Sequence, residues 1–407
     1  MTRSIAIIGT LDTKGEEIEY IKQSIEGRGH RAIVIDVGVL GKAAFEPSIS
    51  RREVARAGGA SLEEITAFNS EEKAMGVMAE GASKVIKDLY LSSELDGALA
   101  LGGTTGTSLA LTVMQVLPIG VPKIILSTVA FSPLIPPDAV AADLMMIQWA
   151  GGLRGINSVC RKVLDEAAGA IAGAAQAHER KEVIKKKVAG VTSRGIVPSR
   201  WLPPLKSGLE QRGYEVAVFH ATGMGGRAFE EAIAEGLIDI ALDLSTGELS
   251  DLVCGGFSSA GEHRLEAAGK RGIPQIVAAG SSGTFSWATG KPLPRRFRNR
   301  AKHVHNSLVT VVATNNAERA AVGKLMAEKL NKATGPTAVI IPLDRPPDDP
   351  SGPFYNPEGL EAFKKTLKGN IKPQIKVVEL DTHINDVSFT DTILALLDEM
   401  IQTKHDS

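Results

Sequence analysis

The chain has few cysteines, no long apolar run and almost no net charge. Its two cysteines, Cys160 and Cys254, are too few for a disulfide framework and favour a reducing compartment. No apolar run reaches the ~20 residues that a membrane-spanning helix needs, and the N-terminus lacks the pattern of a signal peptide. The net charge of -1 gives no sign of binding to nucleic acid or to an anionic membrane. We therefore expect a cytoplasmic protein without a nucleic-acid or membrane partner.

Strand-like and helix-like segments alternate along the whole chain. Short β-branched runs are each followed by a glycine or threonine turn and then by an amphipathic segment; in the first half they cover residues 5–8, 32–36, 97–101 and 123–127. This alternation predicts parallel strands joined by helical crossovers. The rhythm stops in a charged stretch at residues 178–187 and then restarts. We predict an α/β protein with two Rossmann-like, doubly wound domains and mainly parallel sheets, covering residues 1–180 and 186–407.

Two segments of the second half show no periodicity. They cover residues 285–306 and 343–356, and the strands expected around them include residues 275–278, 309–312, 338–341 and 376–379. Long loops without secondary structure are uncommon in compact domains and are usually functional.

Two glycine-rich loops follow strands of the first domain. One reads Gly9-Thr-Leu-Asp-Thr-Lys-Gly15, and the other reads Gly102-Gly-Thr-Thr-Gly-Thr107 and opens a helix. Glycines let backbone N–H groups approach an anion, and a helix N-terminus adds partial positive charge. The residues predicted to bind a phosphorylated ligand are Asp12, Thr13, Lys14, Gly102, Gly103, Thr104, Thr105, Gly106 and Thr107. Asp12 could hold Mg²⁺ or a ribose hydroxyl; the alternative is a pair of ordinary, well-capped turns, and neither loop is a Walker A sequence.

A third glycine loop lies in the second domain. Gly223, Gly225 and Ala228 satisfy the G-x-G-x-x-A pattern, and Asp243 stands twenty residues beyond the first glycine. This is formally a dinucleotide fingerprint. It is a weak one because it lies in the second strand–helix unit of its domain rather than the first.

Several histidines and carboxylates fall at or near predicted strand ends of the second domain. The candidate catalytic residues are His220, Glu248, His303, His305, His383 and Asp386. Carboxyl ends of parallel strands share one edge of a sheet, so these side chains could meet there and serve acid–base chemistry or bind a metal. The alternative is a set of unrelated loop histidines.

The motifs, taken in order, resemble the nucleotide-binding region of the tomato mosaic virus resistance protein family and its bacterial and fungal homologues. The motifs that carry the resemblance include Gly-Thr-Leu-Asp-Thr-Lys14, Leu-Gly-Gly-Thr-Thr-Gly-Thr-Ser108, His-Ala-Thr-Gly-Met-Gly-Gly-Arg-Ala228, His-Val-His-Asn306 and His-Ile-Asn-Asp386. The resemblance implies two Rossmann-like domains, an ATP site in the first, and a homodimer. It maps the nucleotide onto the two N-terminal loops and adds Lys73, at the start of a long helix. Plant members carry a further TIM-barrel domain, which suggests a separate TIM-barrel protein as a partner here.

Three functions follow as hypotheses. The favoured one is an ATP- and Mg²⁺-dependent enzyme of small-molecule metabolism, with a small substrate near the histidines across an interdomain cleft. The second is a non-catalytic ATP-binding dimer that regulates or scaffolds a protein partner. The third is a dinucleotide-dependent oxidoreductase that uses the Gly223 loop.

Overall fold

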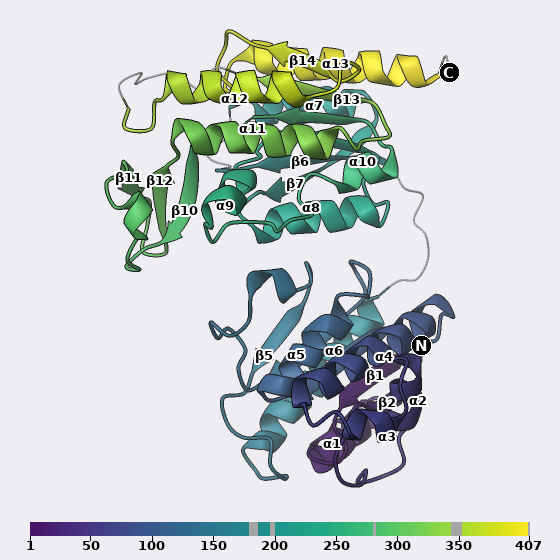
Figure 1. The fold of residues 1–407 in the computed structure, drawn as a ribbon. Helices are drawn as coiled ribbons and strands as arrows, with labels where there is room; N and C mark the ends of the chain where they lie inside the picture. The colour runs from purple at the N-terminus through teal and green to yellow at the C-terminus, as the bar shows by residue number, and fades with distance from the viewer. Residues whose placement is uncertain (179–185, 196–199, 280–281, 343–351, 406–407) are drawn as a thin grey trace. The chain divides into compact units, whose positions relative to one another are not determined.

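The computed structural model divides the chain into two compact units, Met1–Glu182 (unit 1) and Val183–Ser407 (unit 2) (Figure 1). It describes all residues except 179–185, 196–199, 280–281, 343–351 and 406–407. Each unit has its own sheet and its own hydrophobic core. Within the described part of the chain, no helix combines the length and apolar character needed to cross a bilayer.

Unit 1 is built on a five-stranded, fully parallel sheet. Its order is β2-β1-β3-β4-β5, with the strands β1 Ser4–Gly9, β2 Arg31–Asp36, β3 Gly97–Gly102, β4 Lys123–Ser127 and β5 Met145–Gln148. Successive residues of β1 enter different cores: Ile5 and Ile7 join one, and Ala6 and Ile8 the other. The central strands are therefore buried on both faces, which explains their uninterrupted apolar runs.

Helices cover both faces of this sheet. The helices α1 Gly15–Gly27 and α6 Cys160–Ala177 pack on one face, and α2 Arg51–Ala57, α3 Leu62–Thr66, α4 Glu71–Leu91 and α5 Thr104–Met114 pack on the other. A short 3₁₀ turn, η1, covers Pro137–Ala139. The sequence predicted the long helices and the strands β1 to β4, but it did not predict β5, α2 or α3, which are all short.

Unit 2 is built on a six-stranded parallel sheet. Its order is β14-β13-β9-β8-β6-β7, with β6 Lys187–Ser193, β7 Tyr214–His220, β8 Ile240–Asp243, β9 Gln275–Ala278, β13 Thr337–Ile341 and β14 Lys376–Glu379. The helices are α7 Leu202–Gln211, α8 Met224–Ala234, α9 Glu248–Cys254, α10 Ala267–Arg271, α11 Asn316–Leu330, α12 Pro357–Asn370 and α13 Val387–His405. One core lies under α7 and α13, and another under α9, α11 and α12. The prediction of two doubly wound α/β units with mainly parallel sheets is confirmed.

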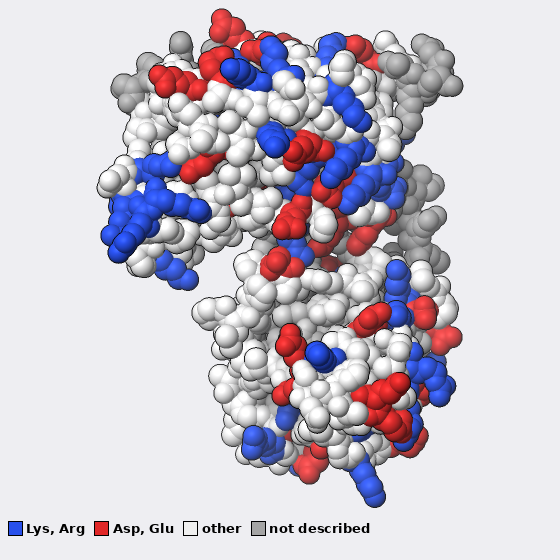
Figure 2. All heavy atoms as spheres, in the orientation of Figure 1, with Lys and Arg blue, Asp and Glu red and all other residues white. Residues whose placement is uncertain are grey.

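An antiparallel insertion corrects part of the prediction for unit 2. The strands β10 Thr284–Ala288, β12 Val309–Ala313 and β11 Lys302–Val304 form a separate sheet in that order, with the 3₁₀ turn η2 at Arg295–Phe297. The segment 285–306 is thus not a structureless loop, and residues 309–312 do not join the parallel sheet. Phe285, Phe297 and Val312 give the insertion a small core of its own. Figure 2 shows Lys and Arg side chains gathered over this part of unit 2.

The other non-periodic segment is only partly described. Residues 343–351 lie outside the described part of the chain, and α12 begins at Pro357, directly after Asn356. The side chain of Asn356 caps this helix by accepting a hydrogen bond from the Gly359 N–H at 2.8 Å. The sequence did not predict α12.

Candidate functional site

The two N-terminal glycine loops line one cavity of unit 1, at the carboxyl edge of its sheet. The cavity has a volume of about 430 Å³, within the range of small-molecule sites. Its polar walls come from Thr10, Asp12, Thr13 and Lys14 after β1 and from Gly102, Gly103, Thr104, Thr105 and Gly106 after β3. Residues between α3 and α4, among them Asn69 and Ser70, close a third side.

The loop after β1 is a tight turn that ends at the N-terminus of α1. The Lys14 N–H donates to the Thr10 carbonyl at 2.8 Å, and the Thr10 and Thr13 hydroxyls lie 2.6 Å apart. A Cβ at Gly15 would collide with Ala44, so the first residue of α1 must be glycine. Lys14 is the N-cap residue and its side chain caps no N–H group. Among the residues that the structure describes, no other side chain accepts from the first-turn N–H groups of α1.

The loop after β3 ends in the same way at α5. Its N-cap residue is Gly103, which has no side chain with which to cap the helix. In contrast, Ser50, Ser61 and Ser70 cap α2, α3 and α4 through their hydroxyls. The helices that begin at the two predicted loops therefore present unsatisfied N–H groups, which suit an anion.

Asp12 has partners that limit the role expected for it. Its Oδ2 accepts a hydrogen bond from the Leu40 N–H at 2.8 Å and lies 3.6 Å from Nη1 of Arg51. Arg51 is itself held by Asp36, whose Oδ2 accepts from its Nε at 2.7 Å. The first task of Asp12 is thus to hold the segment around Leu40 against the cavity, and only one carboxylate oxygen is left for Mg²⁺ or a ribose hydroxyl.

Three other residues that were predicted to bind the ligand lie in three different environments. Thr107 is buried and does not line the cavity; its hydroxyl lies 2.7 Å from that of Ser127 and joins α5 to β4. Lys73 is exposed on α4 and is not among the lining residues, although its N–H donates to the Ser70 hydroxyl at 3.3 Å. Thr105 points to α4, because its hydroxyl donates to Oε1 of Glu71 at 2.9 Å.

The four candidate histidines lie on several elements of unit 2. His220 ends the edge strand β7, is exposed, and accepts a hydrogen bond at Nε2 from the Gly195 N–H at 3.4 Å. His303 lies in β11 and His305 directly after it, both exposed. Among the described residues, no three His, Cys, Asp or Glu side chains form a set that could hold a metal ion. A shared catalytic role for these histidines stays a prediction.

His383 and Asp386 form a local turn rather than a pair of side chains. Asp386 Oδ2 accepts from the backbone N–H of His383 at 2.7 Å, and Nδ1 of His383 accepts from the Asn385 N–H at 3.1 Å. The contact that joins these two residues is therefore made by the Asp386 carboxylate to the backbone of His383 and not to its imidazole.

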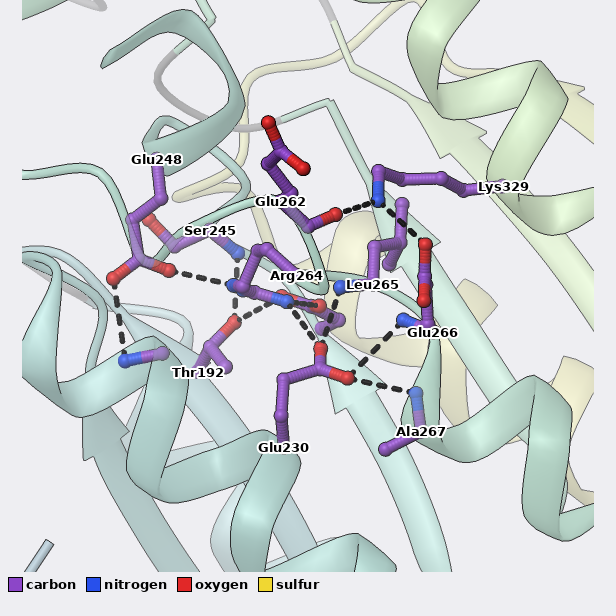
Figure 3. Close-up of polar contacts among 12 residues, drawn as sticks. Thr192, Glu230, Ser245, Glu248, Glu262, Arg264, Leu265, Glu266, Ala267 and Lys329 are labelled. Carbon is purple, nitrogen blue, oxygen red and sulfur yellow. Dashed lines mark hydrogen bonds and ion pairs between the residues drawn. The ribbon is translucent and has the colours of Figure 1, made fainter. Parts of the chain in front are cut away.

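Glu248 fills the N-terminus of α8 (Figure 3). Its Oε1 accepts from the N–H groups of Gly223 and Gly226, at 2.5 and 3.2 Å, and a Cβ at Gly226 would collide with its carboxylate. A Cβ at Gly225 would likewise collide with the His220 carbonyl. The glycines of the dinucleotide pattern thus make room for groups of the protein itself, and the N–H groups that would hold a pyrophosphate already have a carboxylate.

A buried ion network holds Glu248 in this position. Arg264 is 1% exposed and contacts Asp243, Glu248 and Glu230, with its Nε 2.6 Å from Oε2 of Glu248 (Figure 3). Burial raises the pKa of Glu248, and the Arg264 guanidinium opposes that rise. Asp243, the residue expected to bind a ribose in the dinucleotide pattern, is thus an ion-pair partner. No sequence motif indicated Arg264, because its partners lie 16 to 34 residues away along the chain.

A second carboxylate lies nearby, on α9: Asp251 is fully buried and faces Arg194, the partly buried residue that follows β6. Oδ1 of Asp251 accepts from the N–H groups of Ser286 at 2.8 Å and Ser258 at 3.3 Å, so it fastens β10 of the insertion to α9. Its Oδ2 lies 3.7 Å from Nη2 of Arg194, too far for a hydrogen bond. Burial raises the pKa of Asp251 to about 6, against the opposing effect of Arg194.

The fold and the cavity define the class of the protein: an α/β protein of two parallel, doubly wound sheets with a ligand-sized cavity in the first. More particularly, the chain belongs to the uncharacterised protein family UPF0261, whose N-terminal domain matches residues 3–180 and whose C-terminal domain matches residues 186–401. The family expected from the motifs is therefore confirmed.

The relatives support this membership along the whole chain. A UPF0261 protein of Brucella suis is 40% identical over 98% of this chain and 95% of its own length, and one of Clostridium tetani is 39% identical over 99% and 100%. The ToMV resistance protein Tm-1 of Solanum lycopersicum is 30% identical over 97% of this chain and 55% of its own length. Among solved structures, a UDP-N-acetylglucosamine 2-epimerase from Rickettsia bellii covers 100% of this chain and 97% of its own, at 11% identity and a TM-score of 0.22, too low to inform function.

Proposed function

We propose that this protein binds ATP, with Mg²⁺, in the cavity of unit 1. The observation that carries the proposal is that the N-termini of α1 and α5, both without side-chain caps, border one cavity of about 430 Å³. Two sets of unsatisfied N–H groups and two helix dipoles directed at one space favour a ligand with several negative charges.

The cavity wall matches the two ends of a nucleotide. The apolar part of the wall is formed by Val39, Leu40, Ile65, Ala74 and Met75. Such a surface suits a purine ring, whereas the threonine hydroxyls and Lys14 suit phosphates. Lys14 lies on the side of the cavity where the uncapped helices begin.

The carboxylates of the cavity are suited to bind Mg²⁺ only when the phosphates of the nucleotide supply further ligands. Asp12 is already held by Leu40 and Arg51, and Glu71 accepts a hydrogen bond from Thr105. Mg²⁺ in nucleotide sites is commonly held by one or two carboxylates together with phosphate oxygens. One oxygen from each of these side chains would suffice for that arrangement.

A neighbouring cavity supports a metabolic use of the nucleotide. It has a volume of about 470 Å³, shares Thr104 with the first cavity, and carries polar groups from Ser108, Gln115 and Asp138. A small second substrate bound there would lie beside the N-terminus of α5, where the phosphates are proposed to bind. We therefore favour a nucleotide-dependent enzyme over a non-catalytic ATP-binding dimer. Turnover of labelled ATP in a mixture of cell metabolites separates the two, since the non-catalytic dimer would bind ATP without consuming it.

Thermal shift assays test the binding proposal directly. ATP with Mg²⁺ at about 100 times its Kd should stabilise the wild type by about 2.7 kcal/mol. Lys14→Ala should weaken binding by about tenfold or more, because hydrogen bonds to charged groups contribute about 1.5–3 kcal/mol. At the same ATP concentration the stabilisation should then fall to about half or less.

The matched control is Lys22→Ala, which removes a partly exposed lysine of α1 that pairs with Glu26. This variant should keep the full ATP shift. An undiminished shift in Lys14→Ala would place the nucleotide elsewhere.

A further inference from the structure

A long segment of unit 2 carries positive charge only. Residues 267–317 contain eight Lys and Arg residues and no Asp or Glu, although the whole chain has a net charge of -1. Six of these cations lie between residues 291 and 302, in the part of the insertion that leads from β10 to β11. The near-neutral total charge therefore hides a local basic surface, which is visible in Figure 2.

Two of these six cations build the insertion. Arg300 forms a two-pronged ion pair with Glu318, at 3.0 and 3.1 Å, and its guanidinium lies 5.8 Å from the centre of the Phe297 ring. Arg296 lies over the same ring at 4.6 Å and donates to the Cys254 carbonyl at 3.1 Å. The stability of the loop accounts for these two arginines.

The other four cations have no such structural role. Lys291, Arg295, Arg298 and Lys302 are exposed, and in the part of the chain that the structure describes they take part in no ion pair. Lys291, Arg298 and Lys302 line a groove of about 340 Å³. Four unpaired like charges so close together repel one another, and an anionic ligand would relieve that repulsion.

An indole ring lies in the same groove. Trp287 of β10 is half-buried and lines the groove together with Val304. Its Nε1 donates to the Lys291 carbonyl at 3.3 Å, so the ring is held in place where the loop leaves the strand. The groove thus combines a positioned aromatic ring with three cations.

We propose that this groove and the adjoining Arg295 bind single-stranded nucleic acid. Cations that follow the phosphate backbone, together with an aromatic ring on which a base stacks, are the two elements of single-strand recognition. A duplex keeps its base faces stacked and would leave Trp287 without a partner. A stretch of acidic side chains would pair with the cations but would not use the indole ring. The site is independent of the ATP cavity, and it reverses the expectation that the total charge suggested.

Binding of a fluorescein-labelled oligo(dT) of about fifteen nucleotides to the full chain tests the proposal. Anisotropy should report binding that weakens as salt rises, with a slope of about -0.7 per phosphate neutralised. Trp287 fluorescence should be quenched at the same time, and Trp287→Ala should weaken binding by about fivefold or more.

Charge reversal supplies the matched comparison. Arg298→Glu with Lys302→Glu should abolish most of the binding and reduce the salt slope. Lys206→Glu with Lys324→Glu changes the net charge equally on exposed helix positions of the same unit, and should leave binding unchanged. Both pairs lie on the surface, so the fold should persist.

Three outcomes would overturn the proposal. One is equal weakening by the two double variants, which would indicate non-specific attraction. Another is equally tight binding of polyglutamate without Trp287 quenching, which would indicate an acidic protein partner. The third is the absence of salt-sensitive oligonucleotide binding by the wild type.

Discussion

At the scale of single residues, the most informative side chains are carboxylates whose partners lie far away in the sequence. Glu248 was a candidate acid–base group, yet it accepts from Gly223 and Gly226 and pairs with Arg264. Asp12 was a candidate Mg²⁺ ligand, and it holds Leu40 and pairs with Arg51. A motif shows where a carboxylate stands along the chain, but its charge partner depends on tertiary contacts that the motif does not contain.

Asp251 provides a prediction about pH. Its folded-state pKa of about 6 is raised above the ordinary value of 3.8, mainly by burial, so the folded state holds this proton more tightly than the unfolded state does. Its contribution to stability is therefore full below about pH 4 and is lost as pH rises to about 6. The loss should reach about 3 kcal/mol, since each pKa unit corresponds to about 1.4 kcal/mol.

The measurement is urea unfolding of Asp251→Asn and its parent between pH 4 and 7. A Trp149→Phe background leaves Trp201 and Trp287, both in unit 2, as the fluorescent probes. The free energy of unfolding of the parent, relative to that of Asp251→Asn, should fall as pH rises through this window. A constant difference across the range would show that the Asp251 carboxyl is not perturbed.

At the scale of elements, ligand binding at the turn between β3 and α5 can be tested by a substitution that leaves the fold intact. The nearest neighbour of a Cβ at Gly103 would be the Thr128 hydroxyl at 3.7 Å, so the fold tolerates a side chain there. Gly103→Val should therefore keep its unliganded stability. Its side chain would stand where the backbone must approach phosphate, so ATP should bind at least about tenfold more weakly, a loss of about 1.4 kcal/mol.

The control for this substitution is Gly76→Ala. Gly76 lies within α4, and nothing lies within 4 Å of a Cβ built on it. This variant should stabilise α4 slightly and leave ATP affinity unchanged, as measured by calorimetric titration. Unimpaired ATP binding by Gly103→Val would remove the α5 N-terminus from the site.

The elements also show what the sequence reveals and what it hides. Buried parallel strands are continuous apolar runs, and helices such as α4 are long, so both were predicted from the residues alone. Residues 309–312 form the strand that was expected, but an apolar run does not specify its partner strand, and β12 pairs antiparallel with β10 and β11. The two glycine loops were located because each directly follows a strand. The part of the apolar cavity wall that Ile65 supplies was missed because α3, which carries this residue, is only five residues long.

At the scale of the whole molecule, total composition describes this chain poorly. A net charge of -1 is the sum of an acid-free segment with eight cations and a correspondingly acidic remainder. Glycine content is equally uninformative about function, because glycine loops of similar sequence occur in both units. In unit 1 they border a cavity, and in unit 2 the comparable N-terminus of α8 already holds Glu248.

This difference gives the last prediction, which concerns where a nucleotide protects the full chain. In hydrogen exchange followed by mass spectrometry, ATP with Mg²⁺ should slow exchange in residues 10–15, 66–75 and 102–107, since these segments line the cavity or begin its helices. Residues 220–228 should show no change, because the N–H groups of Gly223 and Gly226 already have an acceptor in Glu248. NAD should protect neither region. If NAD instead slowed exchange in residues 220–228, Glu248 would have to move away from the N-terminus of α8. The contacts of Arg264 would then change when a dinucleotide binds, and would not hold this loop in a single conformation.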